Sequence, residues 1–186
     1  FKALLFLGAG SVIHAFKDEQ DIRNMGGVRK KLPYTYTFML LGTLALTGFP
    51  FLSGFYSKDA IIEFAYLKNS TLGNYAATIG IFTAFLTSIY SWRLFFKTFH
   101  GTYNNKKIAI DETHESPLVM LIPLVFLGIG AIFSGYLFKT TFIGHHSNEF
   151  WQESIFFLNE IKHDSIPFWF LLITPILVLI SIPISF

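Results

Sequence analysis

The sequence contains no cysteine, and this absence excludes several classes of chemistry. Without thiols the chain forms no disulfide, no thiolate metal site and no cysteine-ligated iron–sulfur cluster. Charged residues are also scarce, at 14% of the chain, whereas a soluble domain carries about 25%. The net charge of +2 is too small to indicate binding to nucleic acid. We therefore expect no nucleic acid among the partners.

The sequence also lacks the short motifs that bind nucleotides or activate acyl substrates. It contains no GxGxxG fingerprint, no P-loop and no GxSxG elbow, so it presents no site for NADH, ATP or an acyl group. His145 and His146 are adjacent, but adjacent side chains diverge on a helix, and no matching ligands are spaced nearby. We therefore predict no metal site, no cofactor and no redox chemistry on this chain itself.

Apolar and aromatic residues are abundant instead. Hydrophobic residues make up 52% of the chain, and phenylalanine alone supplies 23 residues. The mean hydropathy is +0.50. Lipid-facing helices need this much apolar surface, whereas the core of a soluble domain of this length does not. Strand-like alternation of apolar and polar residues is absent, so we predict an all-α, polytopic transmembrane helix bundle.

Five apolar segments follow one another along the chain, and the last three are near bilayer-spanning length. We expect helical segments at residues 1–16, 33–67, 75–99, 118–138 and 166–186. The first is shorter than a full span of about 20 residues, and the sequence begins and ends within apolar segments. We therefore expect a piece of a longer protein, with about five membrane segments.

Basic residues between these segments predict the orientation in the membrane. If the chain crosses the membrane at each segment, nine lysines and arginines fall on one side and three on the other. The nine are Lys17, Arg23, Arg29, Lys30, Lys31, Arg93, Lys97, Lys106 and Lys107, and the three are Lys68, Lys139 and Lys162. This asymmetry places the richer side in the cytoplasm or the mitochondrial matrix.

The connection from Lys139 to Ser165 is not simply polar. Its apolar side chains recur at helical spacing, which predicts an amphipathic helix at the membrane interface over about residues 146–162. The face of this helix would be formed by Phe150, Trp151, Ser154, Ile155, Leu158 and Ile161. A loop packed on the neighbouring helices is the alternative.

Two adjacent charges, Lys58 and Asp59, lie inside the second apolar segment. A charge in a membrane span costs at least about 2.5–3.5 kcal/mol, so it is rarely present without a function. The same segment carries Gly48, Pro50 and Gly54, which favour a break in the helix, and broken helices mark the ion sites of transporters. A lysine buried at such a break can exchange protons when a neighbouring charge moves. The alternative is a lysine that extends to the membrane interface.

The carboxylates near Lys58 are candidates for the same proton transfer. Asp59 points about 100° away from Lys58 on a helix, so we expect it to face another helix or an exit channel. Pairing with another subunit is the alternative. Glu63 lies at i+5 from Lys58 and is only a marginal partner, so we assign it a supporting role.

Lys2 and His14 are further candidates, both on the first segment. Lys2 precedes Lys17 by about 15 residues, or roughly 22 Å of helix, which predicts a second lysine buried in the hydrocarbon layer. A position at the interface is the alternative. His14 lies beside a charged loop and titrates in the range suited to proton uptake. A capping or packing role for this histidine is equally compatible with its position.

Four stretches occur in the order found in one family of membrane subunits. They read FKALLFLGAGSVIHAFKDEQDIRNMGGVRKKLP, LALTGFPFLSGFYSKDAIIE, SIYSWRLFFKTFHG and HESPLVMLIPLVFLGIGAIFSGYL. Together they resemble the C-terminal part of the largest antiporter-like membrane subunit of complex I, the NADH:quinone oxidoreductase. The resemblance covers nearly the whole chain, and the FIGHH and EFWQESIF stretches are most similar to alphaproteobacterial versions.

The resemblance implies roles for three residues. Lys2 matches the family's central channel lysine, and Lys58 and Asp59 match the lysine and aspartate of the second broken helix, on the exit side. The family's glutamate–lysine pair on the uptake side would precede Phe1. By the same resemblance, residues 1–67 end the proton-conducting domain and residues 68–186 form the C-terminal transmembrane helices.

The resemblance also implies a function. The chain would belong to a proton-translocating, non-redox subunit of an enzyme complex that couples electron transfer from NADH to quinone with proton pumping. Its partners would be the lipid bilayer and other membrane-arm subunits, above all neighbouring antiporter-like subunits, in a bacterial or mitochondrial inner membrane. NADH, FMN, iron–sulfur clusters and quinone would bind to other subunits.

Two alternatives are compatible with the same residues. One is the related large subunit of a multisubunit Na+/H+ antiporter, or of a hydrogenase or carbon-uptake complex. The other is a structural membrane subunit in which Lys58 is only an ion-pair anchor.

Overall fold

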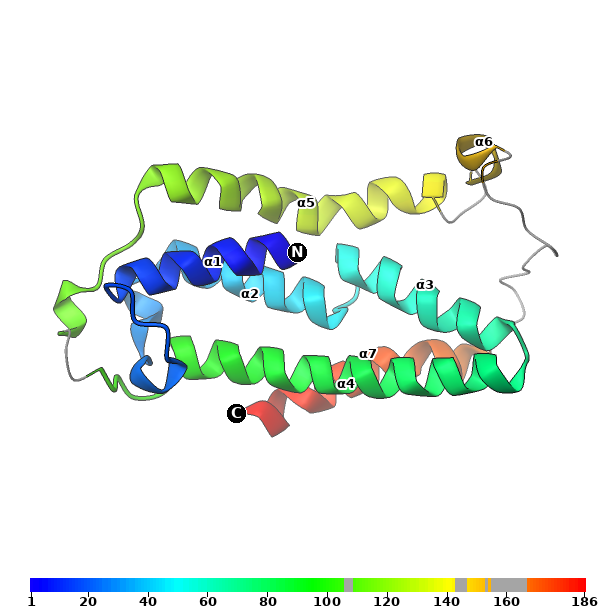
Figure 1. Ribbon diagram of the computed structural model, residues 1–186, viewed down its shortest axis with the longest axis horizontal. Coiled ribbons are helices and arrows are strands. Elements are labelled where there is room, and N and C mark those ends of the chain that lie inside the picture. The colour runs from blue at the N-terminus through cyan, green and yellow to red at the C-terminus, as the bar shows by residue number, and fades with distance from the viewer. Residues whose placement is uncertain (106–108, 143–146, 153, 155–166) are drawn as a thin grey trace.

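The apolar segments form helices that run side by side along one long axis (Figure 1). The computed structural model describes the chain except for residues 106–108, 143–146, 153 and 155–166. The α-helices are α1 (Lys2–Ala15), α2 (Pro33–Thr47), α3 (Ser53–Leu67), α4 (Thr71–Phe99), α5 (Leu118–Phe142), α6 (Ser147–Trp151) and α7 (Phe168–Ser185). Three short 3-10 helices lie in the loops: η1 (Ile22–Asn24), η2 (Val28–Lys30) and η3 (Ile110–Glu112). The predicted all-α class is confirmed, since the described residues contain no strand.

Three helices of the described chain are long and apolar enough to cross a membrane: α4 with 29 residues, α5 with 25 and α7 with 18. α1 is apolar but has only 14 residues. α2 and α3 have 15 residues each. Because a helix rises about 1.5 Å per residue, these two reach across a bilayer only together. The protein is therefore a multi-pass membrane protein whose second segment consists of two half-helices.

The two half-helices form the middle of the bundle (Figure 1). α2 and α3 both contact α4 on one side and α5 on the other, while α1 packs along α2 and α7 packs along α4. The junction between α2 and α3 therefore lies between α4 and α5, although Phe51 within it is 79% exposed. Irregular backbone at membrane depth is tolerated where protein covers it.

Small side chains let α4 and α7 approach each other closely. Ala77, Ala84 and Ser88 are buried on α4, and Val178 and Ser181 are buried on α7. The hydroxyls of Ser88 and Ser181 form a hydrogen bond across the interface. Small residues and hydroxyl pairs of this kind hold transmembrane helices together, because lipid supplies no hydrophobic force between them. The interface fixes the face that α7 presents to the half-helices.

The structure places the described basic residues of the loops and helix ends at the two ends of the bundle, as the sequence predicts (Figure 1). The end where α1 stops, α2 starts and α4 stops carries Lys17, Arg23, Arg29, Lys30, Lys31, Arg93 and Lys97. Lys68 and Lys139 lie at the opposite end. Lys106, Lys107 and Lys162 lie outside the described residues. We call the first of these ends the basic end.

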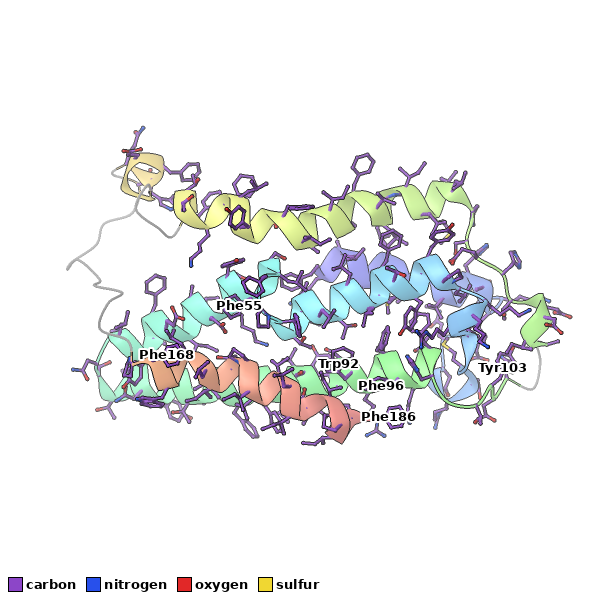
Figure 2. All side chains as sticks on the ribbon, turned by 180° about the vertical axis from the view of Figure 1, so that it is seen from behind. Phe55, Trp92, Phe96, Tyr103, Phe168 and Phe186 are labelled. Carbon is purple, nitrogen blue, oxygen red and sulfur yellow. The ribbon has the colours of Figure 1, made fainter. Side chains whose placement is uncertain are left out.

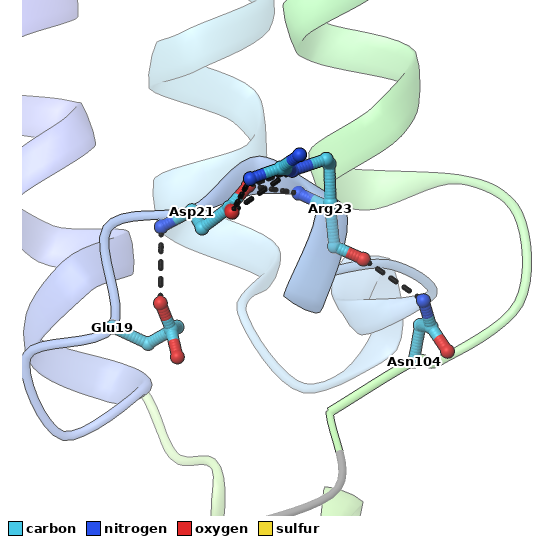
Figure 3. A network of polar contacts seen from close by, with 4 residues as sticks. All are labelled: Glu19, Asp21, Arg23 and Asn104. Atoms are coloured by element: carbon cyan, nitrogen blue, oxygen red, sulfur yellow. Dashed lines mark hydrogen bonds and ion pairs between the residues drawn. The ribbon is translucent and has the colours of Figure 1, made fainter.

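Ion pairs fold the loops of the basic end onto the bundle. Arg23 donates to both carboxylate oxygens of Asp21 at 2.6–3.0 Å, and the Asn104 amide donates to the Arg23 carbonyl at 2.9 Å (Figure 3). The Arg23 guanidinium lowers the pKa of Asp21 to about 2. The loop before α2 is joined to the loop before α5 by two further ion pairs, Lys17–Glu112 at 2.6 Å and Lys31–Asp111 at 2.8 Å.

Glu115, in the loop before α5, caps the start of α2. One of its carboxylate oxygens accepts the Tyr34 N–H at 2.9 Å, and the other accepts the Thr35 hydroxyl. The buried hydroxyls of Ser11 and Ser116 join the same network. An acidic side chain at the positive end of a helix contributes about 0.3–1 kcal/mol. The first half-helix is therefore anchored at the basic end by both α1 and the loop before α5.

The predicted interfacial helix is described only in part. α6 covers only Ser147–Trp151, and Gln152, with a φ of +48°, and Ser154 are not helical, so the predicted helix does not continue through these described residues. The Trp151 indole N–H donates to the carbonyl of Phe142, the last residue of α5, at 3.1 Å. The residues expected further along that helix, 155–162, lie outside the described residues.

Candidate functional site at the helix break

The second segment breaks where the sequence predicts, and glycine is the residue that ends α2. Gly48 has a φ of +85°, in the left-handed region, and closes α2 with a hydrogen bond from its N–H to the Ala45 carbonyl at 3.3 Å. The Phe49 N–H bonds to the Leu44 carbonyl at 2.9 Å. Pro50 follows and has no N–H with which to continue the helix. The chain therefore leaves the helical path at Gly48 and resumes it at Ser53.

Gly54 lets the two half-helices touch. A Cβ at this position would lie 1.8 Å from the backbone oxygen of Ala45, which no side chain tolerates. The first turn of α3 therefore packs backbone to backbone against the last turn of α2. The ring of Phe1 lies 3.6 Å from the same Cβ position, so the start of α1 is at the level of the break.

The break brings helix ends of opposite polarity into the interior of the bundle. The first N–H groups of α3 carry partial positive charge, and the last carbonyls of α2 carry partial negative charge. The residue before α3 is Leu52, whose side chain cannot cap these N–H groups. Polar half-helix ends at this depth are the feature that binds ions in transporters with broken helices.

Lys58 points back toward the break from the second turn of α3. Its Cδ lies 3.6 Å from the position that a Cβ on Gly48 would occupy, because helical side chains lean toward the helix N-terminus. Its Nζ is buried and has no hydrogen-bond partner among the described residues. The side chain therefore does not extend toward the membrane interface, which removes that alternative reading of the sequence.

Asp59 faces a different helix, as the sequence predicts. It is only 8% exposed, and Thr174 of α7 lies close enough to its carboxylate to interact with it. Its Oδ1 has no partner among the described residues. Lys58 and Asp59 are close enough for their charges to interact, but the described structure shows no ion pair between them. The two charges therefore occupy separate surroundings on either side of α3.

Glu63 is the third ionisable residue along α3, after Lys58 and Asp59. It is half-buried and lies one turn beyond Asp59, within range for their two charges to interact. α3 runs from the break toward the end of the bundle opposite the basic end (Figure 1). Lys58, Asp59 and Glu63 are therefore spaced along the second half of the membrane crossing.

A cavity of about 490 Å³ separates the middle parts of α3 and α4. Lys58 lines it together with apolar side chains of both helices, among them Ile62 and Ile79, and with Tyr75 and Thr83. Apolar cavities do not hold ordered water. The side chain of Lys58 therefore lies beside a mainly apolar groove.

The structure does not bring the two candidates on α1 into this site. Lys2 is exposed in this chain, at the start of α1. Its position in the hydrocarbon layer stays a prediction. His14 is also exposed and ends α1 at the basic end, away from Lys58.

Thr174 is a site residue that the sequence analysis missed. It is 5% exposed and is followed by Pro175, a proline inside α7. Hydroxyls are common in membrane helices, so this one carried no signal by itself. The threonine–proline pair interrupting an otherwise apolar span was the available clue.

The fold and site together define a class: an integral membrane protein with a discontinuous helix and a charged lysine side chain buried at the discontinuity. Residues 1–87, which contain the break and Lys58, match the family described as NADH:quinone oxidoreductase/Mrp antiporter, transmembrane. This part of the chain is similar to the antiporter-like family.

Curated relatives agree with this placement. NADH-ubiquinone oxidoreductase chain 5 of Marchantia polymorpha is 53% identical over 167 residues, or 89% of this chain. The chain 5 proteins of Arabidopsis thaliana and Phytophthora infestans are 50% and 49% identical over 89% and 95% of this chain. The chain spans about a quarter of the length of these relatives, which is 25% for the first two and 27% for the third.

Proposed function

We propose that this chain is part of a proton-translocating, non-redox membrane subunit of NADH:quinone oxidoreductase. The subunit contributes to an enzyme complex but performs no electron transfer itself. The observation that carries the proposal is the buried Nζ of Lys58, which lies against the helix break without a partner among the described residues. The names of the chain 5 relatives support the assignment to this complex.

The residues of α3 suggest how the proton moves. Burial without a partner makes the charged form of a lysine costly, so a neighbouring charge that approaches or leaves changes whether the proton stays. Lys58 takes up a proton at the break and releases it toward Asp59 and Glu63, which continue toward the far end of α3. We also propose proton transfer at Lys2, which lies at the start of α1 and outside the site around Lys58.

The partners and location follow from the same assignment. We infer contacts with other membrane subunits of the complex, above all with neighbouring antiporter-like subunits, while NADH, FMN, iron–sulfur clusters and quinone are held elsewhere. The mitochondrial inner membrane is the favoured location, because the curated relatives are eukaryotic chain 5 proteins. A bacterial inner membrane is the alternative.

The proposal is tested by Lys58→Met in the intact complex in its native membrane. NADH-driven acidification and NADH:quinone turnover are recorded together, with Lys68→Met as the control because Lys68 is exposed at the far end of α3. We expect both quantities to fall in the Lys58 variant while the complex stays assembled and the control is unchanged. Normal pumping and turnover in the Lys58 variant would contradict the proposal.

A second candidate is the large subunit of a multisubunit Na+/H+ antiporter. It is favoured by one observation, that the family matched by residues 1–87 includes Mrp antiporters as well as the oxidoreductase. Vesicles containing the intact assembly separate the two functions. Sodium-driven proton movement without NADH supports the antiporter, whereas acidification that requires NADH and stops with a quinone-site inhibitor supports the oxidoreductase.

A further inference from the structure

A second cavity lies near the basic end, between the last turns of α4 and α7. Its volume is about 470 Å³. Arg93, Lys97 and His100 line it from the α4 side, and Ile184 and Phe186 line it from the α7 side. Phe186 packs edge-on against Phe96 of α4, with ring centroids 5.2 Å apart, and the pair lies side by side in Figure 2. The cavity therefore combines an apolar wall with a cationic rim.

The cations of this rim share one face of α4. Arg93 and Lys97 are four residues apart, so they lie one above the other on the helix. Both are exposed, and neither forms an ion pair within the described part of the chain. Lys17, Arg23 and Lys31, by contrast, each bind a carboxylate at the same end. Arg93 and Lys97 are therefore available to an external anion.

Few other charged groups lie near Arg93 and Lys97. Asp21 is within electrostatic range of Lys97, but Arg23 already binds both of its oxygens. His100 shares a hydrogen bond with the Tyr36 hydroxyl at 3.3 Å, and its pKa is lowered by burial and by the charge of Arg29. The α4 C-terminus contributes about half a negative charge, which two full positive charges outweigh.

The cavity lies at the level of the membrane that the lipid headgroups occupy. At about 1.5 Å per residue, Lys97 lies roughly 3 Å and Arg93 roughly 9 Å before the end of α4. The polar layer on each side of a bilayer is about 5–8 Å thick, and long basic side chains extend toward it. The apolar wall continues from this level into the hydrocarbon layer along Ile89 and Ile184.

We propose that the cavity binds one anionic phospholipid of the surrounding bilayer. Its phosphate is held between the Arg93 guanidinium and the Lys97 ammonium, and one acyl chain lies along Ile89, Phe96 and Ile184. Arginine forms paired hydrogen bonds with phosphate oxygens, and basic pockets between membrane helices are a known form of lipid recognition. A free phosphate would use only the rim, whereas the lipid uses the apolar wall as well.

The first test counts the lipids that stay bound. The intact complex carrying Arg93→Gln and Lys97→Gln is purified in detergent, washed extensively, and compared with the unmodified complex by mass spectrometry of its phospholipids. We expect the variant to retain one anionic phospholipid fewer per complex, while Lys30→Gln, an exposed basic residue outside the cavity, retains the full number. The double variant Arg93→Lys and Lys97→Arg exchanges the two residue types but keeps both positive charges. It should retain the full number of lipids. Equal lipid numbers in the double Gln variant and the unmodified complex would overturn the proposal.

A second test needs no variant. The unmodified complex is placed in phosphatidylcholine nanodiscs containing phosphatidylglycerol with a photoreactive acyl chain, and cross-linked peptides are identified. We expect labelling of the peptides that contain residues 89–100 and 184–186, and we expect 50 mM inorganic phosphate not to reduce it. If other lipid-facing helices are labelled but the peptides containing residues 89–100 and 184–186 are not, protein fills the cavity. If inorganic phosphate abolishes the labelling of these peptides, the site binds phosphate alone. Either result would overturn the proposal.

Discussion

The aliphatic stem of Lys58 lies against Gly48, on the opposite side of the helix break. The Cδ of the lysine is 3.6 Å from the point where a Cβ on Gly48 would be, a normal van der Waals distance. Gly48 closes the first half-helix, and Lys58 belongs to the second. Any movement of α3 relative to α2 therefore changes the surroundings of the lysine directly. This contact links the geometry of the break to the charge that it encloses.

The two glycines of the break should differ in their tolerance to alanine. Gly54→Ala places a Cβ 1.8 Å from the Ala45 oxygen and must separate the half-helices, whereas Gly48→Ala meets only Lys58 at 3.6 Å. The cost at Gly48 is the left-handed backbone, about 1–2 kcal/mol. We expect Gly54→Ala to reduce the amount of assembled complex on native gels several-fold, and Gly48→Ala to assemble with reduced pumping. Equal assembly of the two variants would contradict this account.

Thr174→Val should impair pumping without unfolding the bundle. The substitution keeps the shape of the side chain but removes a hydroxyl that lies within interaction range of the buried Asp59, and a buried polar group that loses its partner costs about 1–3 kcal/mol. We expect a lower ratio of protons pumped to NADH oxidised, with Thr174→Ser close to the unmodified complex. The ratio is measured in native vesicles. A Ser variant as impaired as the Val variant would show that packing, not the hydroxyl, is responsible.

The hydrogen bond between Ser88 and Ser181 should make a modest contribution to the packing of α7. Hydroxyl pairs between membrane helices contribute about 0.6 kcal/mol on average and at most about 1.7. In a double-mutant cycle with Ser88→Ala and Ser181→Ala, measured by unfolding in bicelles, we expect a coupling energy in this range. A coupling energy of zero would mean that close packing alone joins α4 and α7.

Asp21 should titrate about two pH units below an ordinary aspartate. Arg23 favours the ionised carboxylate, so its folded pKa is about 2 against a reference value of 3.8. Because the folded pKa is the lower one, the interaction is fully present above pH 3.8 and is lost as the pH falls through 2. Carboxyl ¹³C shifts in the intact membrane protein should give a midpoint near 2. Arg23→Gln should move it toward 3.8, and an unchanged midpoint in that variant would refute the assignment.

The break could be predicted from sequence because its causes are local. Gly48, Pro50 and Gly54 act through their own backbone properties, and Lys58 is conspicuous within an apolar run. The direction of Asp59 also followed from helical spacing alone. These features need no knowledge of which helices become neighbours.

What could not be predicted depends on how the helices pack. The exposure of Lys2 depends on which helices pack against α1, which no pattern within α1 reveals. The proximity of Thr174 to Asp59 joins residues more than a hundred positions apart. The same is true of Glu115, which caps α2 from a loop 80 residues downstream. Such pairs are set by tertiary contacts.

The most direct test of the account is Lys58→Arg in the intact complex. Arginine keeps the positive charge but does not release its proton, so it separates a proton relay from a fixed ion-pair anchor. NADH:quinone turnover and the number of protons pumped per NADH are measured in native vesicles, beside Lys68→Arg as the control. A relay at Lys58 predicts that pumping is lost in the Lys58 variant while the complex remains assembled. Pumping at the unmodified ratio would contradict the account and leave Lys58 a structural charge.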